Sequence, residues 1–195
     1  HVGAKKTIIS HCFHDCFQAD LIDYHEDPQV DINGIEMKWL LVLKDHFTRL
    51  VYLCPIPTKE PKHVASELNH IFGLIGYPLV YQSDNGNEVH SKEVLDILHS
   101  LDPQIVTVRG HSRTPRDQGS VEKANHAIKI SLDKMVKSRQ LHDLANAKKH
   151  SWITEYPRVM AAMNSANCQC SMVDQSPYLL TFGMLFEEPL YNIKL

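Results

Sequence analysis

The stretch MKWLLVLKDH, residues 37–46, contains an uninterrupted run of five large apolar residues. A near-continuous apolar run of this kind is typical of a central β-strand that is buried on both faces. RLVYLCPIP (49–57) follows after a few residues, and its two prolines end the strand. Upstream, residues 13–24 alternate with a period of two: Phe17 and Ala19 point to one side, Asp20 to the other. These segments predict an antiparallel meander of three strands.

After Pro57 the apolar period becomes helical. The spacing predicts helices and strands in the order 64–75 (helix), 79–83 (strand), 91–99 (helix), 104–108 (strand) and 118–138 (helix). Residues 140–195 are expected to be mostly helical, with one amphipathic stretch from Trp152 to Met163 and another that Ser176-Pro177 opens. An antiparallel meander followed by strand–helix alternation predicts an α/β fold, with a mixed five-stranded sheet flanked by helices.

Length and composition limit the class of protein. A chain of 195 residues, 43% hydrophobic and 22% charged, is expected to form one globular domain. We assign residues 1–12 to an N-terminal lead-in and 13–195 to the domain itself. The longest apolar run is far shorter than the ~20 residues of a membrane span, and the first ten residues lack the apolar stretch of a secretory signal. The sequence reads as a piece of a longer protein.

The five cysteines favour a reducing compartment, because their number is odd and they form no C-x-x-C pair. Cys12, His14 and Cys16 alternate in one short segment, so a metal site there is an alternative. The edge of a half-buried strand is the favoured interpretation, because ligands two residues apart on one strand do not surround a tetrahedral ion.

Charge is distributed unevenly, although the net charge is only −3. Residues 1–36 hold seven acidic and two basic side chains, and residues 109–139 hold eight basic and three acidic ones. A charged run is often only a solvated face. An acidic and a basic segment in one domain also suit a site where carboxylates hold cations beside a polyanion.

Three acidic residues occupy positions from which phosphoryl-transfer chemistry can be built. Asp20 lies inside the first strand, Asp84 follows the strand 79–83, and Glu122 lies near the start of the long helix. Carboxylates that meet in space repel one another and need protons or cations to persist. Oxygen ligands of this kind suit Mg²⁺ or Mn²⁺, and two such ions can assist an in-line phosphoryl transfer. The alternative is a chance triad among 23 acidic residues.

The surroundings of these acids favour a site. Asp84 lies in QSDNG (82–86), where Asn85-Gly86 permits a tight turn close to a ligand, although an ordinary Asx turn would read the same way. The basic segment RGHSRTPRDQGS (109–120) is expected to be a loop that follows a flexible polyanion. In the helix behind it, a polar row runs beside the apolar stripe and comprises Glu122, His126, Lys129 and Asp133.

QADLID (18–23), QSDNG (82–86) and DQGSVEKANHAIK (117–129), in this order, resemble the three signature segments of the integrase catalytic core of retroviruses, retrotransposons and related elements. The resemblance covers residues 13–140 and implies an RNase H-like fold. It also implies a D, D, E triad of Asp20, Asp84 and Glu122 that binds two Mg²⁺ or Mn²⁺ ions. The implied activity is metal-dependent polynucleotidyl transfer, with DNA 3′-end processing and strand transfer, in the nucleus and by a homodimer or a higher oligomer.

The same resemblance places Gln118, Asn125 and Lys129 against DNA, while His126 replaces a residue that is often lysine in the family. With the turn after Asp84 and the basic segment, the residues expected to bind DNA are Asn85, Arg113, Arg116, Gln118, Lys123, Asn125, His126 and Lys129.

Three alternatives stay open. Asn164 and SPYLLTFG (176–183) resemble integrases of Gypsy-like and Ginger-like elements and of host genes domesticated from them. A domesticated core could be catalytically silent and act as a DNA-binding or protein-interaction module, or as an oligomeric scaffold. Asp45, at the end of the central strand, could add a fourth acid as in RNase H, and the protein would then cut RNA–DNA hybrids. Asp23 lies an odd number of positions from Asp20, so we read it as structural.

Overall fold

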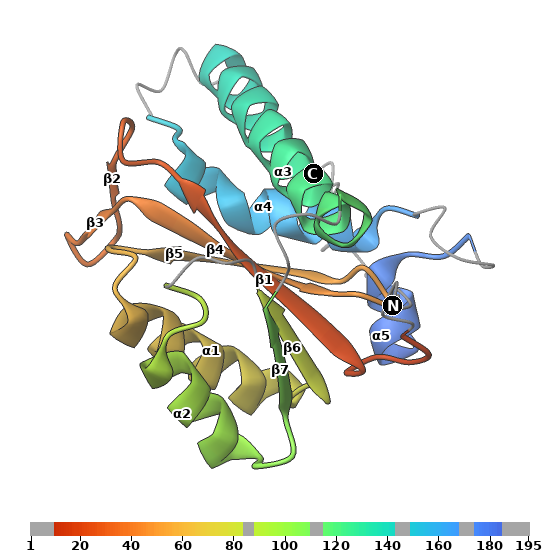
Figure 1. Cartoon of the computed structure of the whole chain (residues 1–195). Coiled ribbons are helices and arrows are strands. Elements are labelled where there is room, and N and C mark those ends of the chain that lie inside the picture. Colours follow the sequence, from red (N-terminus) through yellow and green to blue (C-terminus); the bar gives the residue numbers. More distant parts are fainter. Residues whose placement is uncertain (1–9, 84–87, 110–114, 143–148, 168–173, 185–195) are drawn as a thin grey trace.

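The computed structural model describes residues 10–83, 88–109, 115–142, 149–167 and 174–184, and for 115–122 it describes the backbone alone (Figure 1). The five strands of the main sheet are β1 (Cys16–Asp23), β4 (Trp39–Asp45), β5 (Val51–Ile56), β6 (Val80–Ser83) and β7 (Val106–Arg109). The helices are α1 (Pro61–Ile75), α2 (Lys92–Leu101), α3 (Pro115–His142), α4 (Trp152–Ser165) and α5 (Pro177–Phe182).

The sheet has the order β5-β4-β1-β6-β7. β4 pairs antiparallel with both β1 and β5, whereas β6 pairs parallel with both β1 and β7. The prediction of a mixed five-stranded sheet, with an antiparallel meander followed by parallel strands, is therefore confirmed. β1 lies at the centre, between β4 and β6. The apolar run of β4 is buried on both faces of the sheet, as expected for an interior strand.

The alternation within β1 separates two hydrophobic cores on the two faces of the sheet. Phe17 and Ala19 pack under α1 and α2, while Ile22 packs under α3 and α4 together with Ile128 and Leu132 of α3. Figure 1 shows the same layers, with α1 and α2 on one face of the sheet and α3 and α4 on the other. Asp20, which shares the side of Ile22, consequently faces α3 and α4.

Regular structure also occurs outside the predicted helices and strands. Residues 29–37 include a small hairpin of β2 (Gln29–Val30) and β3 (Glu36–Met37), whose turn Asp31 stabilises by accepting the backbone N–H groups of Asn33 and Ile35. The helix predicted over 118–138 begins earlier, at Pro115, and ends later, at His142. The expectation of a loop over residues 109–120 is therefore wrong from residue 115 on, because proline is well suited to the first position of a helix.

Helix α4 is fixed to the edge strand β5 by Asn164. The side-chain oxygen of Asn164 accepts the backbone N–H of Val51 at 2.9 Å, and its side-chain nitrogen donates to the carbonyl of Val51 at 2.8 Å. Both Asn164 and Val51 are buried. A single amide thus satisfies both backbone groups of one residue on an edge strand, which otherwise would lack partners there.

The start of α4 is fixed to the rest of the domain in a different way. The indole N–H of Trp152 donates to the carbonyl of Asp27 at 2.9 Å, and its ring stacks on Tyr24 with 4.4 Å between the ring centroids. Next to it, the fully buried carboxylate of Glu155 lies 2.7 Å from His150 and 3.1 Å from Arg158. None of the helices in the described parts of the chain combines the length and apolar character that crossing a lipid bilayer requires.

We expect Asn164→Ala to destabilise the chain by about 2–3 kcal/mol, because it leaves a buried N–H and a buried carbonyl of Val51 without their partner. Urea unfolding followed by circular dichroism measures the change. Asn69→Ala is the matched control, since Asn69 is exposed on α1, and should cost less than about 0.5 kcal/mol. Equal stability of wild type and Asn164→Ala would show that the amide does not hold α4 to β5.

Candidate metal and nucleic-acid site

Asp20 lies in the middle of β1 and is only partly buried, on the face of the sheet that α3 covers. Its Oδ1 accepts the backbone N–H of Leu21 at 2.8 Å. Its Oδ2 accepts the side-chain N–H of Asn125, in α3, at 2.6 Å. The carboxylate of a central strand is thereby joined to a residue of the long helix that is 105 positions away in the sequence.

Asn125 reaches Asp20 because α3 packs firmly on the sheet at this point. Ala124 and Ile128, on either side of Asn125, are both buried. The sequence assigned Asn125 to DNA by resemblance, and its contact with Asp20 was not predicted. No local pattern could reveal this contact, because it depends on how the helix docks. The side-chain oxygen of Asn125 is buried and has no hydrogen-bond partner among the described residues, so it is available to a ligand.

The other two acids of the predicted triad belong to segments whose described neighbours lie near Asp20. β6 runs parallel to β1, and Ser83, the residue before Asp84, pairs with Ala19, the residue before Asp20. Asp84 itself lies outside the described residues. Glu122 belongs to α3, three residues before Asn125, but its side chain is not described. Among the side chains that are described, no group of three or more acids, histidines or cysteines could hold a metal ion.

The predicted DNA-binding residues divide in the same way. Asn85 and Arg113 lie outside the described residues, and Arg116 and Gln118 lie in the first turns of α3 without described side chains. Besides Asn125, three predicted DNA-binding residues have described side chains, and all three are exposed on α3: Lys123, His126 and Lys129. An exposed basic row therefore starts beside the residue that contacts Asp20 and is open to a polyanion.

Asp45 does not join Asp20, so its proposed role as a fourth acid is wrong. It pairs with Phe17 and lies on the opposite side of the sheet, whereas Asp20 pairs with Val42. The carboxylate of Asp45 is fully buried and accepts the backbone N–H and the hydroxyl of Thr48, at 2.6 and 2.8 Å. Burial raises the pKa of Asp45, and the hydrogen bonds from Thr48 oppose this rise. Asp45 stabilises the turn between β4 and β5.

Two other candidates also have local roles. Asp23 is exposed and accepts the backbone N–H of His25 at 2.8 Å, which agrees with its structural assignment. The side chains of the Cys12, His14 and Cys16 segment do not converge: Cys12 contacts Asp15, and His14 contacts the carbonyl of Ile75. Burial raises the pKa of Cys16 to about 12. The described residues of this segment therefore do not support the alternative of a metal site.

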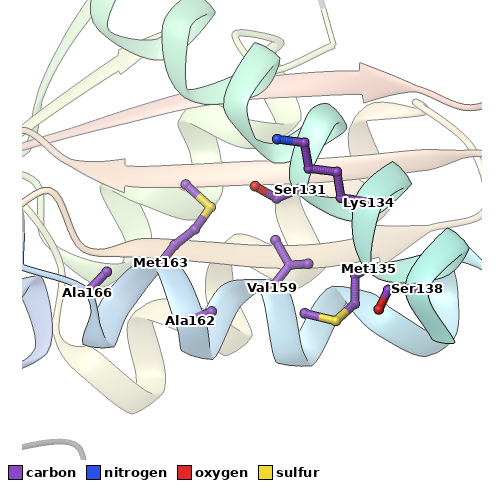
Figure 2. A pocket seen from close by; sticks show the side chains of 8 residues that line it. All are labelled: Ser131, Lys134, Met135, Ser138, Val159, Ala162, Met163 and Ala166. Carbon is purple, nitrogen blue, oxygen red and sulfur yellow. The ribbon is translucent and has the colours of Figure 1, made fainter. Parts of the chain in front are cut away.

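A separate hollow of about 470 Å³ lies between α3 and α4 (Figure 2). Its walls are largely apolar, with Met135, Val159 and Met163 facing the space. Of the eight residues that line it, Lys134 alone carries a charge. The hollow includes neither Asp20 nor Asn125 and offers no carboxylate, so it is distinct from the candidate metal site.

A human protein and several viral polyproteins are among the known proteins with similar sequences. The chain is 31% identical over 169 residues to the human KRAB-A domain-containing protein 2. This match covers 87% of this chain and 32% of that protein. It is 34% identical over 102 residues to the Gag-Pro-Pol polyprotein of Simian retrovirus SRV-1, over 52% of this chain and 6% of the polyprotein. The chain thus spans only a small part of its curated relatives. No protein-family model matches it.

Retroviral integrases are among the solved structures with the same fold. The HTLV-2 integrase catalytic core domain, solved in complex with magnesium in a trimeric form, matches with a TM-score of 0.62 and 19% identity. The match covers 87% of this chain and 97% of that domain, and a dimeric form of the same domain matches as well. The predicted resemblance to integrase catalytic cores, and the RNase H-like fold, are confirmed.

Asp45→Asn should stabilise the protein at pH 7. Because the pKa of Asp45 is raised in the folded state above its usual value of 3.8, its protonated form stabilises the fold at low pH, and this contribution is lost as the pH rises through the folded pKa. Asparagine mimics the protonated form and can still accept from Thr48. The advantage of Asp45→Asn should therefore be present at pH 7 and shrink towards zero as the pH falls to 3.8.

Thermal unfolding of both chains at several pH values measures this difference. The control is Asp96→Asn, at an exposed position of α2, which should change the stability by less than about 0.5 kcal/mol. A less stable Asp45→Asn at pH 7 would mean that Thr48 requires the full negative charge.

Proposed function

We propose that this chain, which has the fold of an integrase catalytic core, is a metal-dependent polynucleotidyl transferase that processes DNA 3′ ends and joins them to target DNA. The observation that carries the proposal is the contact between Asp20 and Asn125. It brings a carboxylate of the central sheet to the helix that bears Glu122, at the end of the sheet where β6 leads into Asp84.

Asp20, Asp84 and Glu122 would hold two Mg²⁺ or Mn²⁺ ions. The described part of the site fits such ions, because Asp20 is a partly exposed carboxylate and the neighbouring Asn125 offers a side-chain oxygen without a partner. Hard divalent cations prefer oxygen ligands of this kind. When bound, the ions would activate the attacking oxygen and stabilise the leaving oxygen of the phosphodiester.

The protein's own residues would bind and orient the substrate. Asn125 holds the Asp20 carboxylate by donating to its Oδ2, while Oδ1 accepts the backbone N–H of Leu21. Lys123, His126 and Lys129 present an exposed row to the phosphates of the DNA backbone. We assign the same role to the predicted DNA-binding residues Asn85, Arg113, Arg116 and Gln118. In this arrangement water attacks first at the DNA end, and the freed 3′-hydroxyl then attacks the target phosphodiester, with no covalent link to the protein.

A second candidate is a catalytically silent core that binds DNA or protein in a host cell. The observation in its favour is the match to a human protein that contains a KRAB-A domain, over 87% of this chain. The intact Asp20, Asp84 and Glu122 favour the enzyme instead. For either function we propose a nuclear location. We also propose a dimer or a higher oligomer, because a similar core domain has been solved in dimeric and trimeric forms.

The two candidates differ in their response to Asp84→Asn. With labelled DNA ends and Mn²⁺ or Mg²⁺, the wild-type chain should carry out strand transfer or its reversal. Asp84→Asn should lower the rate at least about 100-fold, because amides are poor substitutes for ligands that must neutralise metal charge. Asp23→Asn is the matched control, since Asp23 lies on the same strand as Asp20 but is exposed, and should keep the wild-type rate. Equal strand-transfer rates for the wild-type chain and Asp84→Asn would favour the silent core.

DNA binding should depend steeply on salt if the exposed row contacts phosphates. For each phosphate contact that is lost, the slope of log affinity against log salt should become shallower by about 0.9 for duplex DNA. Lys123→Ala and Lys129→Ala should each show this change. Lys62→Ala serves as control, since Lys62 is an exposed lysine of α1 on the opposite face of the sheet. Fluorescence anisotropy at several salt concentrations gives the slopes, and equal slopes for all chains would remove the row from the DNA interface.

A further inference from the structure

Residues 88–91, which we call the return limb, follow the segment that begins with Asp84 and lead into α2. Glu88 forms an ion pair with Lys59 at 2.6 Å, and the carbonyl of Val89 accepts the hydroxyl of the buried Tyr81 at 3.0 Å. Ser91 caps α2 by accepting the backbone N–H of Val94 at 3.2 Å. The return limb is therefore fixed at three of its four residues before His90 is considered.

His90 adds a contact of a different kind, because it joins the return limb to the last residue of β6. Its Nδ1 and the hydroxyl oxygen of Ser83 share a hydrogen bond of 3.0 Å, and the Ser83 side chain is buried. Its carbonyl accepts from the guanidinium of Arg109 at 3.3 Å. Arg109 ends β7 and pairs with Ser83. His90, Ser83 and Arg109 thus form one cluster at the end of β6 and β7 that leads towards the site.

This cluster matters for the site because Ser83 is the residue directly before Asp84. Ser83 is held on one side by pairing with Ala19, next to Asp20, and on the other side by pairing with Arg109. The next residue is Asp84. Whatever holds Ser83 therefore defines the point and the direction from which the chain continues to Asp84, and backbone errors of about 1 Å are costly at a metal or catalytic site.

We propose that His90 is a positioning residue, which holds Ser83 beside Ala19 at the end of β6 and so fixes the residue from which the chain continues to Asp84. This inference rests on the proposed function, since it assigns His90 to the same metal site. His90 itself touches neither substrate nor metal in this role; it acts through Ser83. Burial lowers the pKa of His90, and the positive charge of Arg109 lowers it further, so the ring is neutral at pH 7 and one of its nitrogens can accept a hydrogen bond.

The fold should survive the loss of the His90 side chain. Lys59, Tyr81 and Ser91 still hold the return limb in His90→Ala, and Arg109 still meets the backbone carbonyl of residue 90. His90→Asn is the conservative partner variant, because the δ atoms of an asparagine amide lie where Nδ1 of histidine lies and can bond to the same hydroxyl. Ser83→Ala removes the bond from the other side. His70→Ala is the matched control, at an exposed histidine of α1.

The test is a Mn²⁺ titration of the whole chain by calorimetry, together with hydrogen–deuterium exchange of the amides over residues 80–92. We expect His90→Ala and Ser83→Ala each to weaken Mn²⁺ binding about tenfold, the size of effect seen when partners of metal ligands are removed. Exchange over residues 83–90 should become faster in both variants. His90→Asn should stay within about threefold of wild type, and His70→Ala should not differ from it.

Each other outcome contradicts a defined part of the proposal. Unchanged exchange in His90→Ala would show that His90 does not hold the end of β6. Faster exchange with unchanged Mn²⁺ binding would reduce His90 to a structural role unrelated to the metal. A wild-type chain that binds no Mn²⁺ would overturn the proposed function and the positioning role together. This outcome is distinguishable from a failure of the His90 proposal alone, because no chain, wild type or variant, would then bind Mn²⁺.

Discussion

The parallel pairing of β1 with β6 places Ala19 beside Ser83, and most of the candidate site depends on it. Two strands that run in parallel end at the same edge of a sheet, so the chain leaves β6 for Asp84 next to the strand that carries Asp20. The alternation of β1 then decides which face is used, because Phe17 and Ala19 fill one core and leave Asp20 to the other side. A shift of one residue in this register would turn Asp20 into the core under α1.

Helix α3 connects the hydrophobic core with the polar site. Its buried side chains Ile128 and Leu132 attach the helix to the sheet, and this attachment puts Asn125 within 2.6 Å of the Asp20 carboxylate. The same helix exposes Lys123 and Lys129 to the solvent. Packing on the sheet, the contact with Asp20 and the exposed lysines thus belong to different faces of one helix. Such a division explains how one helix can hold an amide against the Asp20 carboxylate and still present lysines to the solvent.

Polar side chains hold the periphery of the sheet in place. Asn164 satisfies both backbone groups of Val51 on the edge strand, Asp45 satisfies the turn at Thr48, and His90 joins the end of β6 to the return limb. Asn164 and Asp45 supply partners to backbone groups that the secondary structure leaves unpaired, whereas His90 bonds to the hydroxyl of Ser83. The three groups lie on different elements, but all of them hold a strand end or a strand edge, where the ladder of the sheet stops.

The sequence by itself determined the mixed sheet, since the apolar run of residues 37–46 and the alternation before it leave few other packings. It also determined the three signature segments that predict the triad. Only the tertiary structure decided that Asn125 contacts Asp20, that Asp45 lies on the other side of the sheet, and that His90 meets Ser83. These contacts could not be predicted from the sequence, because residue spacing indicates only the periodicity along one element. Contacts between elements depend on how helices and strands dock. The early start of α3 at Pro115 was missed for a different reason, because helix boundaries are weakly encoded in local sequence.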